Sequence, residues 1–461
     1  MNPTEASLFY DTLSMIGNTP MVKVNRLDTG PCSLFLKLES LNPGGSIKDR
    51  IGLSMINEAE KQGLIQKGST LIEATAGNTG LGLALVAAIK GYRLILVIPD
   101  KMSQEKVQHL RAMGAEIVMT RSDVGKGHPE YYQDLAEKIA SETPGSYFIN
   151  QFNNPANPKA HYETTGPEIA AQLNGEVDAV VVGVGSSGTI TGLSQYFREH
   201  YPNTEIILAD PQGSILADYI NKGSFDEAGS WVVEGIGEDF VPDVGDFSHV
   251  KEAITVTDAE SLETARTLLQ TEGILAGSSS GTLIAAALAY CKKQDRPKNV
   301  VTFVCDTGNK YLSKMYNDFW MRDQGFLKVE KRGDLRDVLT RNFQKGEVVT
   351  LKPTDKISHA LRRMKLYEIS QLPVMEDHQI VGIVDESDLL ISLKNHSSDF
   401  DLPIRDIMST QLRLVQKDDS VEVLHELFRK GLVPILMDGE EFLGLITQID
   451  LLNHMRLKFN E

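Results

Sequence analysis

The sequence predicts an α/β protein with a largely parallel sheet over residues 15–325, followed by a smaller duplicated module. In the first part, short β-branched runs alternate with longer helical segments, which is typical of strands joined by helical crossovers. Beyond Gly325 one sequence element occurs twice at a nearly constant offset. A length of 461 residues, at roughly 150 residues per domain, fits about three structural units.

The composition is that of an ordinary globular protein with an acidic surface. Hydrophobic residues make up 41% and charged residues 24% of the chain, as in typical soluble domains. Asp and Glu (63) exceed Lys and Arg (46), and the net charge of −17 repels phosphate backbones and anionic membranes. We therefore predict no nucleic-acid partner and no membrane partner.

The cysteines and the N-terminus favour the cytosol. Cys32, Cys291 and Cys305 show no CxxC spacing and leave one thiol over under any pairing, which suits a reducing compartment. Residues 1–11 lack the basic segment and the apolar stretch of a signal peptide. The longest apolar run, 81–89, is shorter than the roughly 20 residues that cross a bilayer. We predict a soluble, cytoplasmic protein.

The predicted strands are short apolar runs bounded by turn or charged residues, as expected for strands covered on both faces. They include residues 94–98, 179–182, 206–209 and 300–304. Helices are predicted between them, for example over residues 103–113, where an N-terminal Ser and an early Glu favour a helix start.

The sequence pattern changes near residue 325, and a repeated element follows. Gly382 and Asp388 of the first copy recur as Gly444 and Asp450 of the second, an offset of 62 in both cases (444 minus 382, 450 minus 388). Two copies predict units that pack on each other rather than a solenoid, which needs three or more. The predicted regions are a core at 1–325, a linker at 326–335, and repeat units at 336–395 and 400–461.

The first segment that could carry chemistry is 43–50 (PGGSIKDR), in which a lysine follows a glycine pair. The glycines allow a tight backbone before a helical stretch. Burial and a helix N-terminus both disfavour the charged form of Lys48, which would leave its amine neutral and able to form a Schiff base. The alternative is a surface lysine in a helix-starting loop.

The second segment is 75–80 (TAGNTG), which lies between a short apolar run and an apolar helix. Hydroxyl groups, an amide and glycine N–H groups at a strand-to-helix turn suit a carboxylate or a phosphate at the positive helix end. The alternative is simple N-capping by Asn78 or Thr79.

The third segment, 183–189 (GVGSSGT), follows a predicted strand and opens a helix. The spacing of Gly183, Gly185 and Gly188 matches a dinucleotide pattern only weakly. Asp210 lies 22 residues beyond Gly188 (210 minus 188), so the spacing leaves NAD binding open. Backbone amides at this turn most simply bind one phosphate.

Two further segments carry hydroxyl groups or a carboxylate beside predicted elements. Residues 276–282 (AGSSSGT) precede an apolar helix, and a capped helix is the alternative there. Residues 305–309 (CDTGN) end a buried strand, which is where ligand sites of open α/β sheets lie.

Together and in this order, these segments resemble the fold type II pyridoxal-phosphate enzymes of the cysteine synthase and cystathionine β-synthase family, over about residues 13–325. The resemblance implies a two-lobed core and the cofactor pyridoxal 5′-phosphate, held covalently by Lys48. It implies that Asn78 bonds the phenolic oxygen and that Ser279 faces the pyridine nitrogen. The remaining implied cofactor contacts are the phosphate cup, Gly185, Ser186, Ser187, Gly188 and Thr189, together with Asp306.

The same resemblance implies a β-replacement reaction, in which Lys48 takes the Cα proton of an amino acid as general base and a thiol replaces the β-substituent. A neutral hydroxyl at Ser279 does not hold a proton on the pyridine nitrogen as a carboxylate does, which makes the ring a moderate electron sink and favours β-elimination. The implied substrate-binding residues are Thr75, Ala76, Gly77 and Thr79 of the carboxylate loop, together with Gln151.

Two alternatives remain open for the thiol. Residues 210–216 and 234–240 look like cystathionine β-synthase segments, in which Glu234 and Gly235 lie at the second-substrate site and Glu234 is expected to meet the ammonium of homocysteine. Residues 151–158 look closer to cysteine synthase. The leading expectation is serine, or O-acetylserine, plus homocysteine giving cystathionine. The alternative is O-acetylserine plus sulfide giving cysteine, with side reactions that release hydrogen sulfide.

Three positions depart from the family pattern: Glu238 replaces Tyr, Ala76 replaces Ser and Cys305 replaces Pro. The missing hydroxyl at position 76 is expected to alter the preference between serine and O-acetylserine, because the β-substituents of the two donors need different assistance from the enzyme as they leave.

The duplicated tail resembles a tandem CBS (Bateman) module, a family of adenosyl-ligand sensors. In the second copy, 444–450 (GLITQID), the Thr and Asp that hold a ribose map onto Thr447 and Asp450, with Ile449 as an apolar neighbour of the adenine. The first copy keeps Asp388 but lacks the Thr. The resemblance implies S-adenosylmethionine or another adenosyl ligand as a regulator. The alternative is a structural or dimerising module.

The resemblance also implies small-molecule amino-acid substrates and a homodimer or higher homo-oligomer. No haem is expected, because the resemblance begins within the first 15 residues and Cys32 has no CPW context. No metal site is predicted, since His and Cys do not cluster. A binding protein with a degenerate core is disfavoured, because Lys48, Asn78 and Ser279 are all present.

Overall fold

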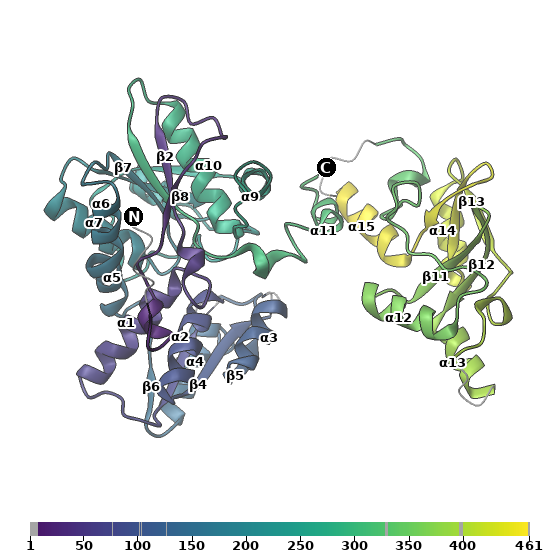
Figure 1. Ribbon diagram of the computed structural model, residues 1–461, viewed down its shortest axis with the longest axis horizontal. Coiled ribbons are helices and arrows are strands. Elements are labelled where there is room, and N and C mark those ends of the chain that lie inside the picture. Colours follow the sequence, from purple (N-terminus) through teal and green to yellow (C-terminus); the bar gives the residue numbers. More distant parts are fainter. Residues whose placement is uncertain are drawn as a thin grey trace. The chain divides into compact units, whose positions relative to one another are not determined.

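A computed structural model describes residues 8–459, apart from 76, 101, 103, 126, 328–330 and 396–399. Contacts within the chain divide it into two units, Met1–Tyr316 and Asn317–Glu461, which are described separately below (Figure 1). The domain bounds expected from the sequence at residues 325 and 336 stay a prediction.

Two sheets form the framework of the first unit. The larger sheet contains β1 (Met21–Lys23), β2 (Ser33–Lys37), β7 (Ala179–Gly183), β8 (Glu205–Pro211), β9 (Val250–Val256) and β10 (Asn299–Phe303). Its order is β1-β2-β10-β7-β8-β9, with β1 antiparallel to β2 and the other pairs parallel. The smaller, parallel sheet has the order β5-β4-β3-β6. Its strands are β3 (Thr70–Ala74), β4 (Arg93–Pro99), β5 (Glu116–Thr120) and β6 (Ser146–Phe148). The predicted α/β class with mostly parallel sheets is confirmed.

Ten α-helices occur among the described residues of this unit. They are α1 (Lys48–Lys61), α2 (Asn78–Lys90), α3 (Gln104–Ala112), α4 (Tyr132–Glu142), α5 (Ala156–Ala160), α6 (Gly166–Gln172), α7 (Gly188–His200), α8 (Leu216–Lys222), α9 (Asp258–Glu272) and α10 (Ser278–Lys292). Helix α3 occupies the segment predicted at 103–113, although residue 103 itself lies outside the described residues. Helix α9 begins with a capping box between Thr257 and Glu260.

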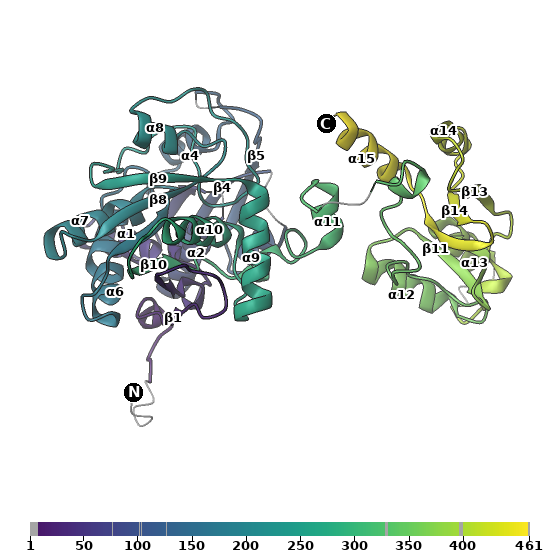
Figure 2. The same ribbon diagram turned by 90° about the horizontal axis from the view of Figure 1, so that it is seen from above.

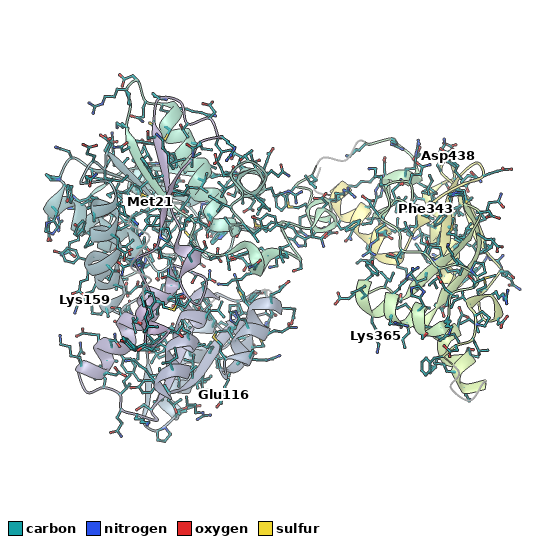
Figure 3. The ribbon with its side chains drawn as sticks, in the orientation of Figure 1. Met21, Glu116, Lys159, Phe343, Lys365 and Asp438 are labelled. Carbon is teal, nitrogen blue, oxygen red and sulfur yellow. The ribbon has the colours of Figure 1, made fainter. Side chains whose placement is uncertain are left out.

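Each sheet has its own apolar core, so the unit has two lobes. Val180 and Val181 of β7 are fully buried in the core of the six-stranded sheet, whereas Leu71 and Leu96 belong to the core of the four-stranded sheet. Figure 1 shows the sheets in separate lobes, and in Figure 2 α9 and α10 lie side by side, with α10 packed against β10. Figure 3 labels Met21 and Glu116 on the edge strands β1 and β5. Helices on the faces of parallel strands explain their unbroken apolar sequences.

Helices α1 and α2 cross at two glycines. A Cβ atom added to Gly82 would lie 2.6 Å from the carbonyl oxygen of Lys48, and one added to Gly52 would lie 2.8 Å from the carbonyl carbon of Gly82. Any side chain at either position would push the helices apart. The two glycines therefore allow Lys48, at the start of α1, and Asn78, at the start of α2, to lie near each other.

A buried ionic network anchors the start of α1 to α6. The Arg50 guanidinium donates to Glu39 at 2.8 Å and to Glu168 at 2.7 Å, and Lys37 donates to Glu168 at 2.7 Å. Burial acts to raise the pKa of Glu168, but Arg50 and Lys37 outweigh it and lower that pKa to about 2. Glu168 is therefore ionised at neutral pH, and each buried charge in this network has an opposite partner.

The second unit is built from two related halves. Its helices are α11 (Asp318–Asp323), α12 (Ile357–Tyr367), α13 (Glu386–Asn395), α14 (Val421–Arg429) and α15 (Gln448–Phe459). Its strands are β11 (Gln371–Glu376), β12 (Gln379–Asp385), β13 (Arg413–Gln416), β14 (Pro434–Asp438) and β15 (Glu441–Leu445). The antiparallel pairs β11–β12 and β14–β15 each carry a register shift, after Val374 and after Leu436. The duplication predicted from the sequence is thus a duplication of structure.

Membrane-spanning geometry is not found in the part of the chain that the structure describes, because its helices fall short of the length and apolar character that a span requires.

Candidate active site

Lys48 is the first residue of α1, at the end of the glycine turn. The neighbouring Ile47 N–H donates to the Cys305 carbonyl at 2.8 Å, and Ser46 forms a β-bridge with Asp306, so the turn is fixed against the end of β10. Desolvation lowers the pKa of the Lys48 amine, although Cys305, Asp306 and the carboxylate of Glu238 act to raise it. The shift has the direction that burial predicts for a lysine amine, and the role of Lys48 stays a prediction.

The predicted carboxylate loop begins at the end of β3 and runs into α2. Its Thr75 N–H donates to the Val97 carbonyl at 3.1 Å, and Gly77 adopts a φ of 142° that other residues rarely reach. The Thr79 hydroxyl donates to Gln151 Oε1 at 2.7 Å. The structure therefore brings together Thr79 and Gln151 at the N-terminus of α2. Ala76 lies outside the described residues.

Asn78 and Asp306 face each other across the two lobes. The Asn78 amide donates to Asp306 Oδ2 at 2.8 Å and accepts from the Lys310 ammonium at 2.9 Å. The Tyr311 hydroxyl also donates to Asp306 Oδ2, at 2.8 Å. These contacts fix the orientation of the Asn78 amide and leave the buried Asp306 carboxylate with two donors.

The predicted phosphate cup joins β7 to α7. Asn157 Nδ2 donates to Ser186 Oγ at 2.9 Å and to the Gln151 carbonyl at 2.9 Å, which ties the cup to the predicted substrate glutamine. Ser187 adopts the left-handed conformation with a φ of 60°, just before α7 begins at Gly188. The Thr189 hydroxyl lies 3.2 Å from His161 Nε2. Backbone N–H groups at the start of a helix of 13 residues suit an anion, and the phosphate cup stays a prediction.

Gly185 has no room for a side chain, because an added Cβ would lie 2.7 Å from the carbonyl oxygen of Gly235. The predicted phosphate cup and the loop of Gly235 therefore approach each other closely. The Glu238 carboxylate oxygen lies 4.0 Å from the same Cβ position. Glu238, one of the three departures from the family pattern, thus faces the cup.

Ser279 is buried in the first turn of α10. The Cys305 thiol lies near Ser279 and Lys48, both of which act to lower its pKa. The Cys305 N–H donates to the Ser280 hydroxyl at 2.9 Å. Burial raises the pKa of the Cys305 thiol to about 12, so the group stays protonated at neutral pH. Cys305 therefore links the start of α10 to the lysine.

Glu234 pairs with two lysines. Its carboxylate accepts from Lys106 at 2.6 Å and from Lys314 at 2.6 Å. Burial acts to raise the pKa of Glu234, but the two ammonium groups outweigh it and hold that pKa below its ordinary value. Binding of a substrate ammonium by Glu234, and the role of Gly235, stay predictions.

Sequence reasoning missed four polar residues that complete this region, namely Lys106, Asn157, Lys310 and Lys314. One signal was available for two of them, because Lys310 and Lys314 follow the fifth segment directly and lie one helical turn apart. The others come from remote parts of the chain. Asn157, for example, is 29 residues from its partner Ser186.

The NAD alternative finds no support at Asp210. This carboxylate is fully buried and accepts from the Ala217 N–H at 2.8 Å, which caps the start of α8. Its role at this position is structural, and it is not presented to a ribose.

The residues present fit pyridoxal phosphate. A lysine with a lowered pKa suits the aldehyde, the crowded cup at Gly185 and the start of α7 suit a phosphate, and a buried neutral hydroxyl at Ser279 suits the pyridine nitrogen. Among the described residues, no group of three or more His, Cys, Asp or Glu is placed to hold a metal ion. Fold and site together define a pyridoxal-phosphate enzyme.

Comparison with known protein families supports the class of pyridoxal-phosphate enzymes. The model described as "Pyridoxal-phosphate dependent enzyme" matches residues 12–306, and that described as "CBS domain" matches 335–395 and 404–457. The chain belongs to the pyridoxal-phosphate dependent enzyme family and carries two CBS domains in its tail.

Two sequence relatives and one solved structure illustrate what the chain is similar to. The cystathionine beta-synthase of Dictyostelium discoideum is 36% identical over 96% of this chain and 91% of the relative. Cysteine synthase 1 of Neurospora crassa is 39% identical over 68% of this chain and 84% of the relative. The solved O-acetylserine dependent cystathionine beta-synthase of Helicobacter pylori superposes with a TM-score of 0.61 at 37% identity, covering 67% of this chain and 98% of that structure.

The two halves of the tail differ at the predicted ligand residues. In the second half, the Thr447 hydroxyl and N–H both donate to Asp450 Oδ2, at 2.6 and 2.7 Å. In the first half, Asp385 stands in the place of the threonine, and it exchanges backbone-to-carboxylate hydrogen bonds with Asp388. Ile449 is 60% exposed. The second half therefore holds a hydroxyl and a carboxylate together, and the first half holds two carboxylates.

Proposed function

We propose that the chain is a cystathionine β-synthase, a lyase that joins C3 of serine or O-acetylserine to the thiol of homocysteine. The observation that carries this proposal is the extent of the similarity to cystathionine β-synthase, which continues through the CBS tail over 96% of this chain. The match to a cysteine synthase covers 68% of this chain. Cysteine synthase activity with O-acetylserine and sulfide is the second candidate, favoured by that relative's 39% identity.

Bound pyridoxal phosphate supplies an electron sink for the bond broken at Cα of the amino acid. Lys48 holds the cofactor and moves the proton at Cα, for which its lowered pKa suits it. Gly185, Ser186, Ser187, Gly188 and Thr189 hold the phosphate, while Asn78, Ser279 and Asp306 fix the ring. Thr75, Gly77 and Thr79, with Gln151, hold the substrate carboxylate at the start of α2.

Product analysis tests the proposal. The purified holoenzyme is offered serine or O-acetylserine against homocysteine or sulfide, and the products are separated by chromatography and mass spectrometry. We expect cystathionine from homocysteine to exceed cysteine from sulfide when both thiols compete at equal concentration. Cysteine as the dominant product with either donor would establish the second candidate instead. Comparing serine with O-acetylserine in the same assay also shows which donor the enzyme prefers. The missing hydroxyl at position 76 is expected to alter this preference.

We further propose that the second half of the tail binds an adenosyl ligand such as S-adenosylmethionine. Asp450→Ala should weaken binding of S-adenosylmethionine by about ten-fold or more, because a carboxylate that accepts from a ribose hydroxyl forms a charge-assisted bond. Asp388→Ala is the matched variant and should cost less, since Asp385 replaces the threonine beside it. Isothermal titration calorimetry measures both, and equal losses would contradict the assignment to the second half.

The remaining expectations stay proposals. They are a homodimer or higher homo-oligomer, a cytoplasmic location, the absence of haem and the domain bounds. The small-molecule substrates of the reaction follow from the proposed function itself.

A further inference from the structure

We infer that Lys310 is a positioning residue for the cofactor. Its ammonium fixes the Asn78 amide in one orientation, which offers an N–H donor rather than the amide oxygen to the phenolic oxygen and so keeps that oxygen deprotonated. The inference rests on the proposed function, from which it takes the roles of Lys48 and Asn78 toward pyridoxal phosphate. It deepens that function, because it assigns the tuning of the cofactor to a lysine outside the predicted site residues.

The buried ammonium of Lys310 has a full set of partners. It donates to the carbonyl oxygens of Gly44 and Gly45, both at 3.3 Å, and to Asn78 Oδ1 at 2.9 Å. Three acceptors need three N–H donors, which a lysine has only in its charged form. The contacts of Lys310 therefore define an ammonium rather than a neutral amine.

The charges around Lys310 are mixed. Burial is the largest influence on its pKa and lowers it, and Lys106 acts in the same direction. The carboxylates of Asp306 and Asp49 act to raise that pKa. The net shift is downward, but hydrogen bonds from the charged form to three acceptors favour that form and hold the proton that burial acts to remove.

Two groups of opposite charge hold the Asn78 amide. Its Nδ2 donates to Asp306 Oδ2 at 2.8 Å, while its Oδ1 accepts from Lys310. Asp306 Oδ2 also accepts from the Tyr311 hydroxyl, so this oxygen carries no proton. If the amide turned over, its NH₂ group would face the ammonium and its oxygen the carboxylate, and both hydrogen bonds would be lost. Each bond has a charged partner, which makes the observed orientation strongly preferred.

The fixed amide keeps one N–H group for a ligand. Nδ2 carries two N–H groups, and among the described residues its partner is Asp306. A donor favours the negatively charged form of the oxygen that it meets, because a hydrogen bond to a charged form stabilises that form. Without Lys310 the amide is free to turn and to offer its oxygen, which accepts from a hydroxyl and favours the protonated form instead.

Lys310 also contacts the glycine turn that precedes Lys48. This turn has other support, because the Ile47 N–H donates to the Cys305 carbonyl at 2.8 Å. By contrast, Oδ1 of Asn78 has Lys310 as its partner among the described residues. Loss of the Lys310 ammonium should therefore act mainly through Asn78.

A double-mutant cycle tests the inference. Absorbance of the cofactor bound to the purified protein reports whether the phenolic oxygen is protonated, and titration of the apoprotein with pyridoxal phosphate gives Kd. In Lys310→Met we expect Kd to rise by about ten-fold, and the ratio of deprotonated to protonated form to fall by about ten-fold, the loss typical of one charge-assisted hydrogen bond. In an Asn78→Ala background the same substitution should change either quantity by less than about two-fold, because the group through which Lys310 acts is gone.

Lys298→Met is the matched control. Lys298 is also a buried lysine, and it donates to Glu205 and to the Tyr290 hydroxyl just before β10 begins, whereas Asp306 follows the other end of that strand. This variant should keep Kd and the absorbance ratio within about two-fold of the parent protein in both backgrounds. Thermal unfolding checks that every variant is folded.

Two further variants keep the inference testable if Lys310→Met does not fold. Lys310→Arg keeps a positive charge with several N–H donors and should retain most of the wild-type absorbance ratio. Lys310→Gln removes the charge and should shift the ratio toward the protonated form. Equal ratios in these two variants would overturn the inference.

The outcomes separate the inference from the proposed function. Equal effects of Lys310→Met with and without the Asn78 amide would show that the lysine acts through the glycine turn, which would overturn the inference. An unchanged absorbance ratio in Lys310→Met would overturn it as well, even if Kd rises. Neither measurement depends on the amino-acid donor or the thiol, so product analysis can reject cystathionine β-synthase activity while the role of Lys310 stands.

Discussion

Replacement of Lys48 by alanine should lower turnover by roughly 10⁴-fold or more, because one side chain both holds the cofactor and moves the proton at Cα. The substitution should also remove the visible absorbance of cofactor joined to the lysine amine. The cofactor is expected to bind more weakly but measurably, since the start of α7 and Asn78 do not depend on Lys48. Absorbance spectra and steady-state rates measure both effects.

A second lysine provides the control for this experiment. Lys298 is 7% exposed and pairs with Glu205 at 3.1 Å, at the end of β10 remote from the site. Lys298→Ala should lower the unfolding temperature but keep the visible absorbance. Residual turnover in Lys48→Ala above one-hundredth of the wild-type rate would show that another group moves the proton.

Replacement of Gly188 by alanine should weaken cofactor binding by about ten- to hundred-fold. An added Cβ would lie 1.8 Å from Oδ1 of Asn157, so the asparagine must move. Its two hydrogen bonds, to Ser186 and to the Gln151 carbonyl, would be lost together. Each bond contributes about 1 kcal/mol, and a tenfold change in affinity corresponds to about 1.4 kcal/mol.

Cofactor titration monitored by absorbance measures this loss, and Gly125→Ala is the matched control. Apart from its chain neighbours, no atom of the described residues lies within 4 Å of a Cβ added at Gly125, so the same substitution adds a methyl group without a clash there. If Gly188→Ala binds the cofactor as tightly as Gly125→Ala, the phosphate does not sit at the start of α7.

The secondary-structure elements and the cofactor motif could be predicted because each depends on residues that are close together in the sequence. Parallel strands buried on both faces are continuous apolar runs, and residues 179–182 and 300–304 have this pattern and form β7 and most of β10. The glycine turn that precedes Lys48 is equally local. Similarly, the offset of 62 residues revealed the repeated halves of the tail.

The partners of Glu234 could not be predicted in this way. Its bond to Lys106 joins residues 128 positions apart, and its bond to Lys314 joins residues 80 positions apart. Sequence spacing carries no information on such pairs, because their distance is set by how the two lobes pack. The resemblance implied that the Glu234 carboxylate binds a substrate ammonium. The fold showed that this carboxylate already pairs with two lysines, Lys106 and Lys314.

The sequence by itself therefore determined the α/β class and the duplicated tail, and it predicted the lysine and the phosphate turn, since each depends on residues that are neighbours along the chain. The tertiary structure alone decided which charges meet. The crossing of α1 and α2 at Gly52 and Gly82 brings Lys48 near Asn78, and the packing of α3 against the loop of Glu234 makes a charged pair from distant residues. Side-chain charges act over a few ångströms, and only the folded chain fixes distances on that scale.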